Sequence, residues 1–82
     1  MNTQQPIGEA ITDGVITAKV RAALGEDPLT ASYAICVDTL HGIVELTGFV
    51  DTEIVHIEAL QVAEHVRGVR RVRDLLDVRR LD

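Results

Sequence analysis

The middle of the chain alternates apolar and polar residues with a period of two between Gly42 and Val50. A strand with one buried face shows this alternation. Its apolar side carries Val44, Leu46 and Val50, and its other side carries Glu45, Thr47 and Phe49. Residues 34–39 form a second β-rich run just before it. Leu40-His41-Gly42 is therefore predicted to be a short hairpin connection in which Gly42 takes a positive φ.

A helical period governs the residues before this hairpin. The apolar positions recur at i, i+4, i+7 and i+8 and are Ile16, Val20, Ala23 and Leu24, so they share one helix face. We expect the helix to begin at Thr12 or Asp13, because either side chain can cap it with an oxygen atom. Gly25 is predicted to end it in the left-handed conformation, and Pro28 prevents its continuation.

A second helix is predicted from the cap at Asp51-Thr52-Glu53 to about Val66. Its buried face is expected to carry Val55, Ala59, Val62, Ala63 and Val66. Ile54 and Ile57 fall nearly opposite that face, and Leu60 lies at its border. These three are either scattered surface hydrophobes, which are common, or a stripe that faces a partner.

A third strand is predicted over roughly residues 70–78, where Val72, Leu76 and Val78 alternate inward. The element order is then α-β-β-α-β, and a strand, helix and strand in sequence favour a parallel pair. The predicted class is α+β, a three-stranded mixed sheet with two helices packed on one face. We expect residues 1–11 to be a flexible lead-in, residues 12–79 to be one domain, and residues 80–82 to be a short tail.

Charge is unevenly spread along this chain of 82 residues, which has a formal net charge of −5. Six arginines lie after residue 60, so the C-terminal part is locally basic. Tyr33 and Phe49 are its aromatic residues, which argues against stacking recognition of single-stranded nucleic acid. Cys36 lies in a predicted strand and is expected to be a small packed hydrophobe.

The sequence offers little for catalysis. No two of His41, His56 and His65 have metal-ligand spacing on one helix face, and Ser32 has no nucleophile motif around it. We therefore predict no catalytic residues, no cofactor and no metal. The chain also has no signal peptide pattern or transmembrane run, so we expect a cytoplasmic protein, or a periplasmic one if a signal has been removed.

Two motifs with a fixed order and spacing resemble the BON domain, the bacterial "OsmY and nodulation" domain. The first is G-x-V-x-L-x-G-x-V at residues 42–50, and the second is V-x-G-V-x-x-V at residues 66–72. The resemblance covers about residues 12–79, nearly the whole chain. Asp74 stands where the family often has Asn, and Leu75 adds an apolar residue on the uncovered side of the sheet.

The resemblance implies a non-enzymatic module linked to osmotic-stress or envelope protection through binding of anionic phospholipid. Candidate headgroup-binding residues are Arg70, Arg71, Arg73, Arg79 and Arg80. One alternative is a protein-interaction or homo-oligomerisation module, whose candidate partner-facing residues are Ile54, Ile57, Leu60, Phe49 and Leu75. Another is a cytoplasmic potassium-binding protein. No nucleic-acid partner is expected, and the sequence leaves the oligomeric state open.

Overall fold

Two helices and three strands follow one another in the predicted order. The computed structural model describes residues 11–79. The elements are α1 (Asp13–Glu26), β1 (Cys36–Leu40), β2 (Ile43–Val50), α2 (Glu53–Glu64) and β3 (Arg71–Val78). The predicted α+β class and the α-β-β-α-β order are confirmed. Of the predicted lead-in, Ile11 alone is described, and it packs against the core. The predicted tail lies outside the described residues.

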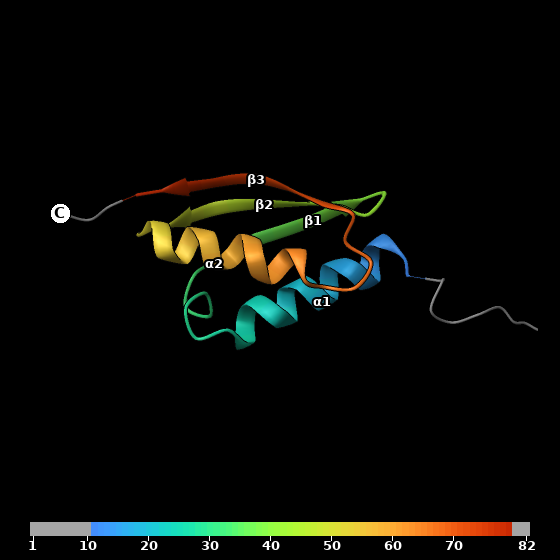
Figure 1. Cartoon of the computed structure of the whole chain (residues 1–82), viewed down its shortest axis with the longest axis horizontal. Coiled ribbons are helices and arrows are strands. Elements are labelled where there is room, and N and C mark those ends of the chain that lie inside the picture. The colour runs from blue at the N-terminus through green and yellow to red at the C-terminus, as the bar shows by residue number, and fades with distance from the viewer. Residues whose placement is uncertain (1–10, 80–82) are drawn as a thin grey trace, which may run out of the picture.

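The three strands form one mixed sheet in the order β1-β2-β3. β1 pairs with β2 in antiparallel fashion, and β2 pairs with β3 in parallel fashion. Both helices lie on the same side of the sheet (Figure 1). Among residues 11–79, the central strand β2 is therefore covered on one face only, which explains its alternation of buried and partly exposed side chains.

The hydrophobic core lies between the sheet and the two helices. Its buried side chains are Ile16, Val20 and Leu24 of α1, Val37 of β1, Val44 and Leu46 of β2, and Ala59 and Ala63 of α2. Because Ala59 and Ala63 have small side chains, α2 packs close to the sheet. Burial of this aliphatic surface is the main favourable term for folding.

The end of α1 differs from the prediction. Gly25 does not adopt a left-handed conformation, and the helix continues to Glu26. Asp27 leaves the helix with an extended backbone, because the proline that follows it disfavours the helical region at the preceding residue. Its carboxylate then accepts a hydrogen bond from the Leu29 backbone N–H at 2.8 Å. The residue that ends α1 is thus Pro28 rather than Gly25.

The surroundings of α2 and β1 refine two other predictions. α2 is capped by the Thr52 hydroxyl, which accepts from the Val55 N–H, and it ends at Glu64 rather than near Val66. Cys36 is exposed, so the prediction of a packed cysteine is wrong. The physical reason is the strand period, which turns Val37 of β1 toward the core and Cys36 away from it.

Candidate functional site

The helices leave one face of the sheet uncovered, and we call it the open face. Strand register places its side chains in rows across β1, β2 and β3. From the hairpin outward the rows are Leu40, Ile43 and Arg71; Asp38, Glu45 and Arg73; Cys36, Thr47 and Leu75; and finally Phe49 and Asp77, with Arg79 beside them. The open face therefore combines apolar side chains with three acids and three arginines.

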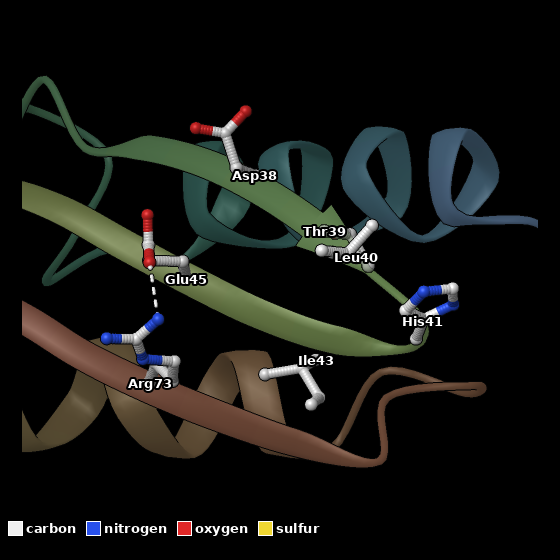
Figure 2. A pocket seen from close by; sticks show the side chains of 7 residues that line it. All are labelled: Asp38, Thr39, Leu40, His41, Ile43, Glu45 and Arg73. Atoms are coloured by element: carbon white, nitrogen blue, oxygen red, sulfur yellow. Dashed lines mark ion pairs between the residues drawn. The ribbon is translucent and has the colours of Figure 1, made fainter.

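The second of these rows is a line of charges. Figure 2 shows Arg73 of β3 reaching toward Glu45 of β2, with Asp38 of β1 on the far side of the central strand. The Nη1 atom of Arg73 lies 3.2 Å from the Oε2 atom of Glu45. Both side chains are partly exposed to solvent, so this pair contributes only about 0–1 kcal/mol. Next to the row is a hollow of about 370 Å³ that includes Leu40 and Ile43 in its lining.

The end of the open face farthest from the hairpin is built around Phe49. The guanidinium carbon of Arg79 lies 4.8 Å from the centre of the Phe49 ring, within the range of a cation–π contact. The Nε atom of Arg79 also lies 3.1 Å from the Oδ2 atom of Asp77. Arg79 is therefore already engaged by an aromatic ring and by a carboxylate.

The hairpin turn is held by the first turn of α1. His41 and Gly42 both have positive φ, at 54° and 79°, as a two-residue hairpin loop requires. The Asp13 carboxylate accepts hydrogen bonds from the backbone N–H groups of His41 at 2.8 Å and Gly42 at 2.9 Å. The first of these bonds is the main cause of the lowered pKa of Asp13, and the second adds to it.

Basic residues gather at the same end of the molecule, which we call the hairpin end. The loop from α2 to β3 returns there (Figure 1), and the Arg70 backbone N–H donates to the Gly42 carbonyl at 2.8 Å. The Arg70 guanidinium donates to the His41 carbonyl at 3.3 Å. Arg70, Arg71 and Ile43 line a shallow hollow of about 240 Å³, and Leu40 is exposed beside the turn.

Of the predicted headgroup-binding arginines, the structure brings Arg70 and Arg71 together at the hairpin end. Arg73 and Arg79 lie along the open face, each beside a carboxylate. Arg80 lies outside the described residues. Within residues 11–79, Arg71 has no ion-pair partner.

The predicted partner-facing residues fall on two separate surfaces. Phe49 and Leu75, with exposed fractions of 56% and 48%, lie on the open face. Ile54 and Ile57 are exposed on α2, whereas Leu60 is partly buried against the core. The helix and sheet candidates therefore do not form one continuous surface.

A further polar network was not predicted. His56 of α2 has its Nε2 atom 2.6 Å from the Oδ2 atom of Asp74 on β3, and its Nδ1 atom 3.2 Å from Glu53 Oε1. The Asp74 hydrogen bond is the larger cause of the raised pKa of His56, and the Glu53 hydrogen bond is the next. Asp74 also accepts from the Leu76 backbone N–H at 3.1 Å. Only the i, i+3 spacing of Glu53 and His56 was visible in the sequence.

Two further observations bear on the kind of site. In the part of the chain that the structure describes, no three metal-ligating side chains gather into a group that could hold an ion. Over the same residues, neither helix is long and apolar enough to cross a bilayer.

Comparison with known proteins identifies the fold. The family model described as BON domain matches residues 12–80. The chain belongs to the BON-domain family. Among its relatives is the osmotically-inducible protein Y of Escherichia coli (strain K12), which is 40% identical over 78 residues. The match covers 95% of this chain and 39% of that protein, so this BON chain spans well under half the length of its relative.

Proposed function

We propose that this BON domain is a non-catalytic binding module that serves in osmotic-stress protection by docking its hairpin end on anionic phospholipid. The observation that carries the proposal is the placement of Arg70 and Arg71 around one shallow hollow, beside the exposed side chain of Leu40. Arginines bind phosphate through several donors, and an exposed leucine at the same end can enter the headgroup region. The name of its relative, osmotically-inducible protein Y, supports the link to osmotic stress.

The hairpin end suits this role better than the rest of the arginine-bearing strand. Arg73 and Arg79 have carboxylates beside them, and a headgroup would compete with these for the guanidinium groups. Arg71 has no such partner among the described residues, and Arg70 donates to a neutral carbonyl. Each free arginine near an anionic surface contributes about 1 kcal/mol. Because the whole chain has a charge of −5, the binding is weak and sensitive to salt.

Vesicle co-sedimentation at low ionic strength tests the proposal. The probes are phosphatidylcholine vesicles with and without phosphatidylglycerol. The wild-type chain is expected to sediment with the anionic vesicles only. The double variant Arg70→Gln, Arg71→Gln is expected to bind roughly thirtyfold more weakly, the equivalent of about 2 kcal/mol.

The matched control is Arg73→Gln, Arg79→Gln, which changes the net charge by the same amount on the open face, farther from the hairpin end. It is expected to retain most of the binding of the single chain, because carboxylates already lie beside these two arginines. Equal losses in the two double variants would show that bulk charge, rather than the hairpin end, governs the association. No sedimentation of the wild-type chain with anionic vesicles would refute the lipid function.

A further inference from the structure

We propose that two copies of this chain pack open face against open face, related by a two-fold axis that runs along the central strand β2. This goes beyond the proposed lipid function and does not depend on it. The open face lacks a covering layer within residues 11–79, and exposed apolar side chains lie on it. Phe49 and Leu75 have exposed fractions of 56% and 48%. Exposed apolar side chains on a sheet face that no helix covers are candidates for an interaction surface.

The charges of the open face indicate that the partner is a second copy. The chain as a whole is acidic, yet the open face carries equal numbers of acids and arginines, so two copies of it do not repel each other through net charge. The two signs are unevenly distributed over the strands, because Asp77 is the one acid of the open face that lies on β3, whereas Glu45 lies on β2. The arginines all lie on β3 or just after it, while Asp38 lies on β1, across the central strand. Asp38 has no ion-pair partner among the described residues.

A two-fold axis along β2 brings these opposite charges together. It places β3 of the second copy over β1 of the first, and it leaves each row of the open face opposite the same row of its partner. Asp38 then faces the partner's Arg73, and Arg73 faces the partner's Asp38. Sheets that pack face to face lie about 10 Å apart with nearly aligned strands, which side chains from both sides can span.

The same axis brings apolar side chains of the two copies together. Ile43 and Phe49 lie on the central strand, so each meets its own copy, and Leu75 faces the strand that carries Cys36. Glu45 also meets its own copy. The Arg73 guanidinium, 3.2 Å from Glu45 in each chain, offsets the repulsion between these two carboxylates (Figure 2).

The other face-to-face arrangement is less favourable. A two-fold axis perpendicular to the strands would place β3 over β3, which sets the arginine-bearing strands against each other. Repulsion between like charges at an interface strongly disfavours such an arrangement. The distribution of charge therefore favours the axis along β2, which also leaves the two hairpin ends pointing in the same direction.

A charge-swap experiment without lipid tests this inference. Wild-type chain is expected to show a concentration-dependent monomer–dimer equilibrium in sedimentation velocity. Asp38→Arg alone sets arginine against arginine, and Arg73→Asp alone sets aspartate against aspartate. Each variant by itself is expected to weaken dimerisation at least tenfold. An equimolar mixture of the two is expected to recover the dimer, because each altered residue then faces an opposite charge on the partner.

Three controls keep the result interpretable. Ile57→Lys alters α2, away from the open face, and is expected to leave the dimer unchanged. Phe49→Lys adds a charge near the axis and is expected to give a monomer, which provides a second variant if a charge swap impairs folding. Thermal melting by circular dichroism confirms that each variant is folded.

A strictly monomeric wild-type chain would overturn the inference, as would single variants that associate as strongly as wild type. Dimers lost in the single variants but not recovered in the mixture would overturn the axis along β2. Because no vesicle is present, none of these outcomes bears on the lipid-binding proposal. In the same way, a failure to bind vesicles leaves the dimer result intact.

Discussion

The Asp13 carboxylate accepts a hydrogen bond from the Gly42 backbone N–H at 2.9 Å, although 29 positions separate the two residues. Its other oxygen accepts from the His41 N–H. The first turn of α1 therefore holds the β1–β2 turn in its positive-φ conformation. This contact connects the beginning of the helix to the hairpin end and to the arginines beside it.

Loss of this carboxylate is expected to destabilise the fold. Asp13→Ala should lower the Tm by several degrees, because two backbone donors lose a charged acceptor. The lowered pKa of Asp13 gives this contribution a definite pH dependence. It is fully present above the unfolded pKa, about 3.9, and is lost as the pH falls through the lower, folded value. Glu64→Ala, which removes an exposed carboxylate without such bonds among the described residues, is the control in a melt at neutral pH, and equal Tm values for the two variants would contradict the role of Asp13.

The contact between His56 and Asp74 predicts the opposite pH dependence. The pKa of His56 is raised, first by Asp74 and then by Glu53. Its contribution is fully present below the unfolded pKa of about 6.5 and is lost as the pH rises through the higher, folded value. Urea denaturation below and above this pH range measures how far the free energy of unfolding falls as the pH rises. His56→Gln is expected to make this fall smaller. A decline of the same size in the variant would show that other groups cause it.

Two glycine-to-alanine substitutions should act in opposite directions. Gly48 has a φ of +121°, and a Cβ placed there would lie 2.8 Å from the Ala34 carbonyl oxygen. Gly48→Ala is therefore expected to cost about 1–3 kcal/mol. Gly25 lies inside α1, and a Cβ added there would meet no atom within 4 Å, so Gly25→Ala should stabilise by about 0.5–1 kcal/mol. Denaturant melts show whether the free energy of unfolding falls or rises in each variant. A destabilised Gly25→Ala would contradict the helical assignment at that residue.

Thr30 is the buried polar side chain that closes the C-terminal end of α1. It is 1% exposed, and its hydroxyl donates to the Leu24 carbonyl at 2.6 Å. Thr30→Val keeps the shape of the side chain but leaves this buried carbonyl without its donor, which should cost about 1–3 kcal/mol. Thr30→Ser retains the hydroxyl and serves as the control in urea melts. If valine proved as stable as threonine, the hydrogen bond would make no net contribution.

The order of elements was predictable because it depends on local patterns. The period-two alternation around Val44 and Leu46 defined the central strand, and the helical spacing of Ile16 and Val20 defined the core face of α1. The positive φ of Gly42 followed from turn chemistry in the same way. Each of these signals lies within a few residues of the structure that it predicts.

The features that the sequence did not reveal depend on contacts between distant residues. Thr12 and Asp13 are equally good candidates for the helix cap in the sequence, and the structure assigns the cap to Thr12. The hydrogen bonds of Asp13 to the hairpin arise only after folding. The pairing of His56 with Asp74 joins α2 to β3 in the same manner. The sequence also presented the arginines of the third strand as one group, whereas the register sets Arg73 beside Glu45 and leaves Arg71 without an ion-pair partner among the described residues.

The hydrogen bond from Leu76 to Asp74 has a consequence for the outer edge of the sheet. The Arg79 N–H donates to Val50 of β2, and because N–H groups alternate along a strand, that of Leu76 points away from β2 toward the edge. The Asp74 carboxylate occupies this donor and places a negative charge where another strand would have to approach. Charged side chains on an edge strand discourage uncontrolled strand addition. Asp74 thus disfavours aggregation through backbone pairing at the β3 edge. The open face stays available for ordered contacts.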